Sequence, residues 1–165
     1  MAVLEIKKLN DPVLRRKCAP VKKVDKEIRK IIVDMAQTMK ESQGIGLSAS
    51  QVGISKRLIV VQSDLKSGRI LGLINPEIKK KSKEKETDKE GCLSFPGIFL
   101  EIKRAKEILI EAQDFNGKKI QLKASNLFAR VFQHEIDHLN GILFFNRLSF
   151  VRKVGFKMKY PKIKM

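Results

Sequence analysis

Apolar side chains recur every three or four residues in one stretch near the start of the chain. They are Ile28, Ile31, Ile32, Met35 and Met39. This spacing places them on one face of a helix. Asp25 is a residue type favoured at a helix N-cap, and Gly44 follows the stretch where a helix commonly stops. We therefore predict a helix from Asp25 to Ser42.

The middle of the chain shows short apolar or alternating runs bounded by turn residues, which is the pattern of strands. The predicted strands cover residues 57–62, 70–74, 106–113, 119–122 and 142–145. Asn75-Pro76 is expected to stop the second strand, and Asn116-Gly117 to connect the third and fourth as a hairpin. The lysine-rich run at 79–89 is predicted to be a solvated edge strand or loop.

A second long helix is predicted to open at Ser125 or Asn126 and to end at Asn140-Gly141. A short helix from Ser149 follows it. Strands in the middle and helices near both ends make an α+β pattern. We expect mixed, mainly antiparallel β-sheets packed around a central helix that carries the sequence HEIDH.

Length and composition are those of one globular domain spanning residues 1–165. No apolar run reaches 18 residues, so no membrane span is predicted. Charged residues interrupt the first 20 positions, which excludes the apolar core of a secretory signal. We therefore expect a cytoplasmic protein with reduced thiols, in which a Cys18–Cys92 disulfide is disfavoured and Cys18 is a small packed residue.

The net charge is +17, from 35 basic and 18 acidic residues. Such an excess invites a nucleic-acid partner, but lysines scattered over polar faces account for most of it without one. The stretch after His138 differs, because it contains no Asp or Glu while Lys and Arg recur. The basic tail, about residues 149–165, is therefore a candidate for contact with a polyanion.

The second long helix contains His134, Glu135 and His138, which together form the pattern H-E-x-x-H. Positions four apart lie on the same face of a helix, so both imidazoles can reach one metal ion. Glu135 projects from a neighbouring stripe, where a carboxylate can exchange a proton with a water molecule at that ion. The alternative is a pair of surface histidines that pair with Glu135 and Asp137 and bind no metal.

A catalytic metal site commonly has three protein ligands, and the two histidines supply two. The chain has no third histidine and no acidic residue after this helix, so the third ligand must lie upstream. Cys92 is the candidate, and Gly91 beside it lets the backbone approach an ion closely. Two imidazoles and a thiolate suit zinc or ferrous iron, and three ligands favour an open catalytic site over a closed structural one.

The glycine-rich segment GIGLSASQVG, residues 44–53, lacks the Lys-Ser/Thr ending of a phosphate-binding loop. Its glycines would let backbone lie against an extended ligand, and Gln51 offers an amide donor for an oxyanion. Taken alone, the segment is more simply a glycine-rich turn between a helix and a strand.

Together, three segments resemble the peptide deformylase family, whose members remove the formyl group from new bacterial polypeptides. They are Gly44–Gln51, the Glu-Gly-Cys-Leu-Ser sequence at Glu90–Ser94, and the Gln-His-Glu-x-Asp-His sequence at Gln133–His138. Their order and spacing fit the family pattern over almost the whole chain. Ser48 departs from it, because the family usually has alanine there.

The resemblance implies a role for each site residue. Cys92, His134 and His138 would bind one divalent metal, Fe²⁺ or Zn²⁺, with Ni²⁺ or Co²⁺ able to substitute. A water molecule activated by the metal would attack the formyl carbon. Glu135 would act as general base and acid, while the Gln51 amide and the backbone N–H of Leu93 would stabilise the oxyanion.

The resemblance also implies substrates and partners. Substrates would be N-formylmethionyl nascent peptides, with formate as one product. The predicted substrate-binding residues are Ile45, Gly46, Glu90, Gly91, Leu127 and Val131. Leu127 and Val131 share a helical stripe with His134 and would wall a pocket for the methionine side chain, together with Ile45. The basic tail would make at most a transient contact with the ribosome or its RNA, and no membrane or DNA partner is expected.

Two competing hypotheses come from parts of the same pattern. H-E-x-x-H alone would fit an endopeptidase of the zincin type, although the downstream ligand of such enzymes is missing. The net charge would fit a metal-stapled basic module that binds RNA without hydrolysing anything.

Overall fold

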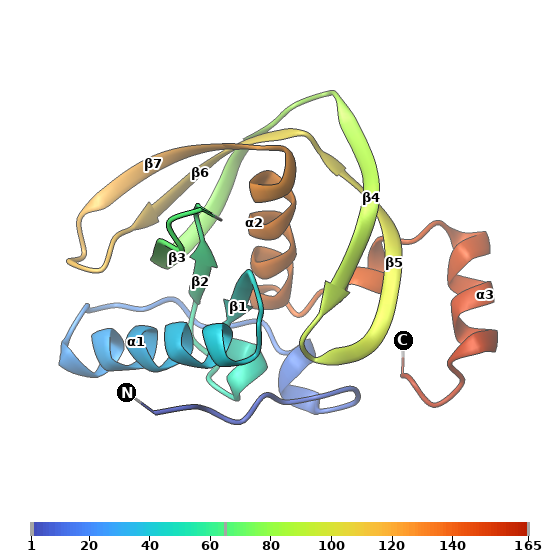
Figure 1. The fold of residues 1–165 in the computed structure, drawn as a ribbon, viewed down its shortest axis with the longest axis horizontal. Coiled ribbons are helices and arrows are strands. Elements are labelled where there is room, and N and C mark those ends of the chain that lie inside the picture. The colour runs from blue at the N-terminus through green and yellow to red at the C-terminus, as the bar shows by residue number, and fades with distance from the viewer. Residues whose placement is uncertain (1, 65, 165) are drawn as a thin grey trace.

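A computed structural model describes residues 2–64 and 66–164 of the chain. Within these ranges the protein has an α+β fold in which the helix α2 (Asn126–Leu139) stands between two sheets (Figure 1). The larger sheet has the strand order β1 (Gly46–Ser48), β2 (Leu58–Gln62), β3 (Ile70–Lys81), β6 (Glu107–Gln113) and β7 (Lys119–Ser125). The smaller sheet is the hairpin of β4 (Lys85–Cys92) and β5 (Phe95–Ala105). All of these neighbouring strands pair antiparallel, and an isolated parallel bridge joins Ala19 to Lys56. The predicted fold class is confirmed.

The predicted helices are confirmed at nearly the expected bounds. Helix α1 (Lys26–Glu41) begins after Asp25, whose carboxylate accepts the N–H of Ile28 at 3.0 Å. Helix α3 (Phe150–Lys159) follows Ser149 as predicted. Three short 3₁₀ helices are also present in the described part: η1 (Pro12–Arg15), η2 (Ala49–Val52) and η3 (Phe144–Arg147). No helix among the described residues is long and apolar enough to cross a membrane.

Two sequence predictions about strands are wrong. Strand β3 does not stop at Asn75-Pro76 but continues to Lys81, because the pairing with β6 shifts register between Ile74 and Glu77. A proline without a ladder hydrogen bond is tolerated at such a bulge, and Asn75 adopts a positive φ of 52° there. The strand predicted at 142–145 is absent from the described chain, where η3 occupies residues 144–147.

Strand β5 carries no prediction at all, although it forms one side of the site described below. Its partner β4 begins in the lysine-rich run at 79–89, and the side chains of that run are mostly exposed. This agrees with the predicted solvated edge strand. The two strands pair in register from Lys85 opposite Ala105 to Glu90 opposite Leu100, with an irregularity before Cys92.

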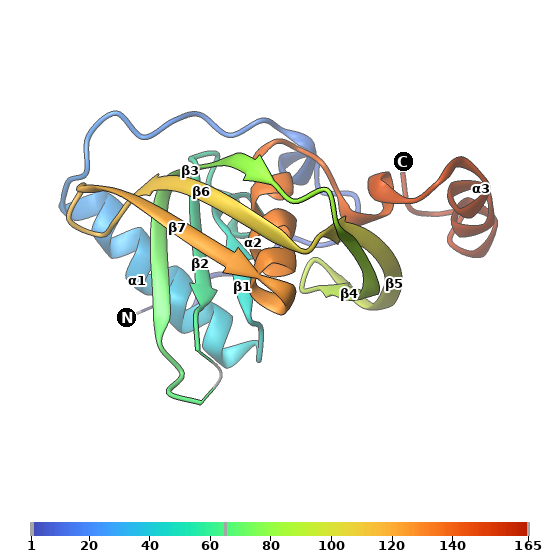
Figure 2. The same cartoon turned by 90° about the horizontal axis from the view of Figure 1, so that it is seen from above.

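Three groups of buried side chains hold these elements together. One lies between α2 and the larger sheet and includes Cys18, which is buried as predicted. Another joins α1 to β1 and β2. The third lies under the β4–β5 hairpin and is rich in phenylalanine: Phe95, Phe144, Phe145 and Phe156. The hairpin therefore has its own apolar support, and Figure 2 shows it on the opposite side of α2 from α1, with α3 at the far end of the molecule.

Candidate metal centre and active site

Two segments far apart in the sequence bring the three predicted metal ligands together. Helix α2 presents His134 and His138 on one face, and the end of β4 presents Cys92. Cys92 Sγ lies 3.2 Å from His138 Nε2, which in turn lies 3.2 Å from His134 Nε2. The donor atoms of all three residues are within 4.8 Å of one another. Both histidines are buried, so the group lies inside the protein and is not a surface cluster.

This donor set fits a tetrahedrally bound divalent ion. With ordinary zinc distances, two ligating imidazole nitrogens would be about 3.3 Å apart, and a nitrogen and a thiolate sulfur about 3.5 Å apart. The observed 3.2 Å separations are close to both values. Both cysteines are free thiols, so Cys92 is available as a thiolate ligand. An open fourth position would face the cavity described below, which is the arrangement of catalytic sites.

The surroundings shift the pKa values of the two histidines in opposite directions. His134 Nδ1 lies 3.0 Å from Glu90 Oε2, a contact that leaves Nε2 free to face the other two ligands. Burial alone would lower the pKa of His134, but contacts with Cys92 and Glu90 outweigh it and raise this pKa well above the usual value. A metal ion at Nε2 therefore competes with a proton. Burial, reinforced by the charge of His134, lowers the pKa of His138, which favours the neutral ligating form.

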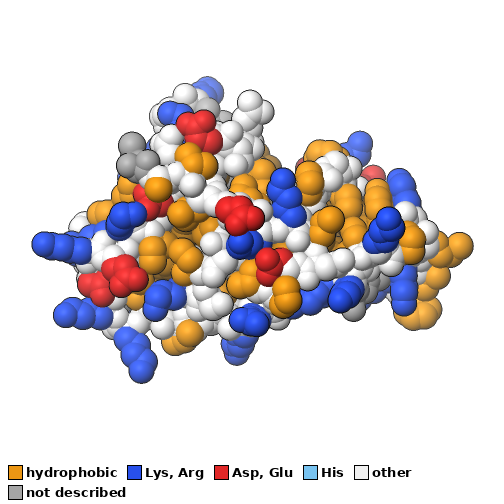
Figure 3. Space-filling model, turned by 90° about the horizontal axis from the view of Figure 1, so that it is seen from below, with side chains coloured by type: hydrophobic (Ala, Val, Ile, Leu, Met, Phe, Trp, Pro, Cys, Tyr) orange, Lys and Arg blue, Asp and Glu red, His pale blue; other side chains and the backbone are white. Residues whose placement is uncertain are grey.

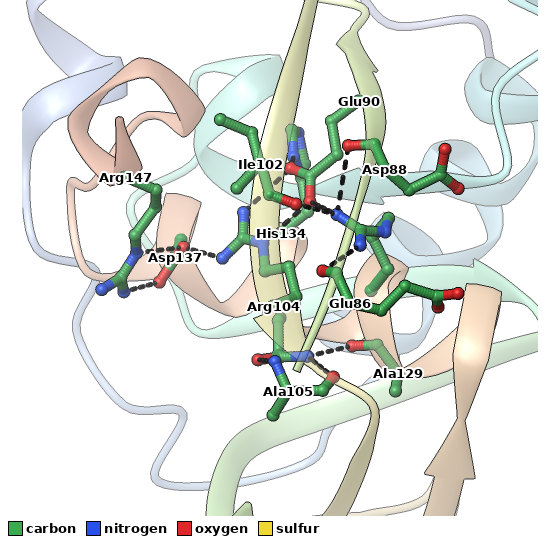
Figure 4. A network of polar contacts seen from close by, with 12 residues as sticks. Glu86, Asp88, Glu90, Ile102, Arg104, Ala105, Ala129, His134, Asp137 and Arg147 are labelled. Carbon is green, nitrogen blue, oxygen red and sulfur yellow. Dashed lines mark hydrogen bonds and ion pairs between the residues drawn. The ribbon is translucent and has the colours of Figure 1, made fainter. Parts of the chain in front are cut away.

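Glu90 belongs to a buried network of ion pairs behind the metal ligands (Figure 4). Arg104 of β5 grips both of its oxygens, from Nε at 2.8 Å and from the second terminal nitrogen at 3.0 Å. Arg130 of α2 donates to Glu90 at 2.8 Å and to the carbonyl oxygen of Ile102 at 2.7 Å. Burial would raise the pKa of Glu90, but hydrogen bonds from Arg104 and His134 outweigh it and lower this pKa to about 2. Glu90 is therefore an anion that can fix the orientation of His134.

The same network continues along α2 to η3. Arg104 also donates one hydrogen bond to Asp137, at 2.5 Å. Asp137 accepts two more hydrogen bonds from Arg147. Figure 4 shows Arg104 between the two carboxylates, with Arg147 on the far side of Asp137. Asp137 is thus held by two arginines and is not part of the group formed by Cys92, His134 and His138.

Glu135 points from α2 toward β1 beside the metal ligands. It is buried, and its Oε2 has no hydrogen-bond partner within residues 2–64 and 66–164. Burial raises the pKa of Glu135 to about 7, with the charge of His134 acting in the opposite direction. A Cβ atom at Gly46 would lie 2.5 Å from Glu135 Oε1 and 2.8 Å from Val131 Cγ1. Only glycine lets β1 pass this close to the carboxylate.

Gln51 and Leu93, the two predicted oxyanion donors, lie next to Cys92. Gln51 Nε2 is 3.4 Å from Cys92 Sγ and 3.3 Å from Ser94 Oγ. Leu93 follows Cys92 in the two-residue turn that leads to Phe95, so its N–H lies beyond the last paired residue of β4. Both residues line the cavity that holds the metal ligands Cys92 and His134.

A cavity of about 520 Å³ opens beside Cys92, His134 and Glu135. Each predicted substrate-binding residue lines it: Ile45, Gly46, Glu90, Gly91, Leu127 and Val131. Val131 is buried at its floor, while Ile45 and Leu127 are partly exposed. Glu90 lines the cavity although its carboxylate is held by arginines, and its contact with substrate stays a prediction. The size falls within the range of small-ligand sites.

Phe99 gives the cavity a wall that the sequence did not reveal. It is 69% exposed, and its ring lies so close to Gly91 that a Cβ there would be 2.8 Å from Phe99 Cε1. Glycine at position 91 was predicted to allow close approach to a metal. The structure shows that it accommodates the ring of Phe99 across the β4–β5 hairpin.

Other residues of the site were also missed by sequence reasoning. Arg104 and Arg130 are both buried. Arg104 lies two residues after Ile102, on the same inward face of its strand, and Arg130 lies within the mostly apolar helical run LFARVF. A charged residue on the inward face of an element needs a buried partner, and this signal could have pointed to a network. Ser48 and Ser94, which contact Gln51, carry no such signal because serine is common in turns.

Comparison with known proteins gives a consistent result. The model of one family, polypeptide deformylase, matches residues 3–154. A peptide deformylase from Picosynechococcus sp. is 47% identical over 165 residues, covering 94% of this chain and 88% of that protein. A peptide deformylase from Thermodesulfovibrio yellowstonii is 42% identical over 162 residues, covering 97% of this chain and 98% of that protein.

Solved structures of peptide deformylases have closely similar folds. The crystal structure of peptide deformylase from Thermus thermophilus has a TM-score of 0.91 at 41% identity, covering 97% of this chain and 94% of that one. The enzyme from Synechococcus elongatus, solved in complex with actinonin, has a TM-score of 0.89 at 40% identity. That match covers 98% of this chain and 87% of the other.

Proposed function

The chain belongs to the polypeptide deformylase family, and we propose that it removes the N-formyl group from the initiator methionine of newly made polypeptides. The products are formate and a peptide with a free N-terminal methionine. The observation that carries the proposal is the grouping of Cys92, His134 and His138 beside Glu135 and Gln51 at one cavity. We place the activity in the cytoplasm, where nascent chains are made.

We propose that Cys92, His134 and His138 hold one divalent ion, Fe²⁺ or Zn²⁺, with Ni²⁺ or Co²⁺ able to replace it. Two imidazoles and a thiolate suit both native candidates. When bound, the ion supplies a Lewis acid that activates water for attack at neutral pH. Glu90 fixes the ring orientation of His134 through Nδ1.

Glu135 moves the proton in the proposed reaction. Its carboxylate takes a proton from the attacking water as the water oxygen bonds to the formyl carbon. It then delivers that proton to the amine nitrogen as the carbon–nitrogen bond breaks. A pKa of about 7, raised by burial, suits a group that must accept and donate in one cycle. Glu135 Oε2 has no hydrogen-bond partner among the described residues, so it is available for this exchange.

Donors from two elements stabilise the charge that develops on the formyl oxygen. The Gln51 side-chain amide approaches from η2, and the Leu93 N–H from the turn after β4. Both are part of rigid structure, so little reorganisation is needed when the oxyanion forms. Each such donor in a hydrolase is worth roughly 100- to 1000-fold in kcat.

The methionine side chain occupies the apolar part of the cavity in this proposal. Val131 and Leu127 wall it from α2, and Ile45 from the segment before β1. The peptide backbone lies beside Gly46 and Gly91 in strand-like pairing. The match of the polypeptide deformylase family model to residues 3–154 favours this proposal over the endopeptidase hypothesis.

We further propose a transient contact between the basic tail and the ribosome. Helix α3 carries the cations Arg152, Lys153, Lys157 and Lys159, and no acidic residue. Arg152 already binds the carbonyl oxygen of Glu101 at 2.8 Å, which leaves the lysines for a polyanion. Figure 3 shows Lys and Arg side chains spread over the whole of one face, while most of the acidic side chains visible there lie in its left and middle parts.

Formate release from a formyl-methionyl peptide tests the proposed activity. The protein is purified without oxygen, its metal content is measured, and wild type is compared with Glu135→Ala. We expect formate from wild type, and at least a 100-fold lower kcat from the variant at equal metal content. Wild type that holds metal but releases no formate would contradict the proposal.

Deleting residues 151–165 should separately weaken salt-sensitive ribosome binding, and unchanged binding would contradict the proposed contact of the basic tail.

A further inference from the structure

Ser48 is a fully buried residue at the end of β1, directly before η2. Its hydroxyl donates to Gln51 Oε1 at 2.9 Å. Its backbone N–H donates to the same oxygen, also at 2.9 Å. Both lone pairs of the Gln51 carboxamide oxygen therefore face one residue.

These two contacts fix which way the Gln51 carboxamide faces. If the amide were flipped, its NH₂ group would meet the backbone N–H of Ser48 with no acceptor between them, and the Ser48 hydroxyl would lose Oε1 as its acceptor. In the observed orientation Nε2 faces Cys92 Sγ at 3.4 Å and Ser94 Oγ at 3.3 Å. The amide donors therefore point into the reaction site.

The hydroxyl also changes the strength of the amide as a donor. Hydrogen bonds in a chain polarise one another, by perhaps 10–30% per bond in a protein interior. A second hydrogen bond accepted at Oε1 draws electron density from the amide nitrogen. The N–H groups of Gln51 then carry more positive charge toward a developing oxyanion than they would beside alanine.

We propose that Ser48 is a positioning residue of the reaction, which orients and polarises the Gln51 amide through its hydroxyl. The inference rests on the proposed deformylase function for its effect on rate. The geometry of the amide can be measured without any turnover. Ser48 touches neither substrate nor metal in this account, and it acts through Gln51 alone.

Ser48→Ala is the test, and Ser50→Ala is its matched control. Both remove one hydroxyl from a fully buried serine in adjacent parts of the same segment. The Ser50 hydroxyl contacts Ser48 Oγ at 3.2 Å and the carbonyl oxygen of His138 at 3.4 Å, and it does not touch the Gln51 carboxamide. Ser48→Ala removes a single oxygen atom and adds no volume, so the variant is expected to fold.

Two readouts are taken at equal metal content. In ¹⁵N-labelled protein, the side-chain NH₂ signals of Gln51 are assigned by their loss in Gln51→Ala. We expect Ser48→Ala to shift these signals and to speed the exchange of the two amide protons, whereas Ser50→Ala leaves them in place. With a formyl-methionyl peptide, Ser48→Ala should lower kcat about three- to tenfold, the worth of one hydrogen bond, with KM within twofold.

Unmoved Gln51 signals in Ser48→Ala would overturn the inference, whether or not kcat falls. A kcat loss of the same size in Ser50→Ala would also overturn it, because the effect would then come from local packing. If wild type releases no formate, the proposed function fails, and the Gln51 signals still decide whether Ser48 sets the amide.

Discussion

Arg104 is the central cation of the buried network, and Arg104→Met replaces it with an unbranched apolar side chain that is shorter and uncharged. The residue makes three charge-assisted hydrogen bonds, two to Glu90 and one to Asp137. Its side chain is 4% exposed. Methionine fills part of the vacated space with apolar atoms and leaves both carboxylates with fewer partners.

The expected loss of stability depends on the ion pairs that remain after the substitution. Removing one partner of a buried ion pair costs about 3–5 kcal/mol when the other charge is left alone. Here Glu90 keeps Arg130 and Asp137 keeps Arg147, so neither carboxylate loses its last cation. We therefore expect a loss near the lower limit, about 3 kcal/mol in the free energy of unfolding. At a denaturant slope of about 2 kcal/mol per molar urea, the midpoint falls by about 1.5 M.

Urea unfolding of metal-free, reduced protein measures this cost without the added stability that a bound ion supplies. Arg104→Lys is the matched variant, since lysine keeps the charge but cannot span both oxygens of Glu90. It should fall between wild type and Arg104→Met. In a separate titration, Arg104→Met should weaken metal affinity about tenfold, because the partner of His134 is held less firmly.

A midpoint shift below 0.3 M for Arg104→Met would refute the reasoning about the network. Arg104→Lys equal to wild type would refute the narrower claim that the two-pronged contact with Glu90 matters. If Arg104→Met binds the metal as tightly as wild type, then Arg104 stabilises the fold but does not affect metal binding by His134.

Three further outcomes follow from the structure. Cys92→Ser should lose or exchange its metal, as elemental analysis after anaerobic purification would reveal, and full occupancy with normal activity would rule out the thiolate ligand. Gly46→Ala should lower formate release at least tenfold while Tm changes by a few degrees, because the new Cβ would lie 2.5 Å from Glu135 Oε1. Asp34→Asn should destabilise the protein at pH 7 and lose this effect toward pH 3. The hydrogen bonds from Lys30 and then from the N–H of Ala2 lower the pKa of Asp34, so its stabilisation exists above the unfolded pKa of about 3.9 and disappears as pH falls through the lower folded value. A pH-independent difference in Tm would contradict this assignment.

Much of the candidate site could be predicted because its chemistry is written in local spacing. On a helix, residues 134 and 138 must share a face, and Glu135 must lie beside them, whatever surrounds the helix. The third ligand was expected upstream, because no acidic residue follows the helix, and Cys92 beside Gly91 was the candidate. The bounds of α1 and α2 also followed from periodicity and caps.

Strands were predicted less well, because their existence depends on partners. Residues 95–105 become β5 by pairing with β4, and that pairing is not encoded in either segment alone. Asn75-Pro76 reads locally as a stop, yet a register shift against β6 carries β3 past it. The short run at 142–145 looks like a strand by its sequence, but it pairs with no strand in the described structure, and residues 144–147 form η3 instead.

Local spacing in the sequence was enough to identify His134, His138 and Glu135 as candidates to hold a metal ion and move a proton, because side chains on one helix have fixed directions. The tertiary structure alone decided how those groups are held. It placed Arg104 and Arg130 around Glu90, set Ser48 against the Gln51 amide, and laid the ring of Phe99 over Gly91. Each of these contacts joins different elements or the ends of a tight turn. Their geometry depends on strand register and packing, which no local pattern records.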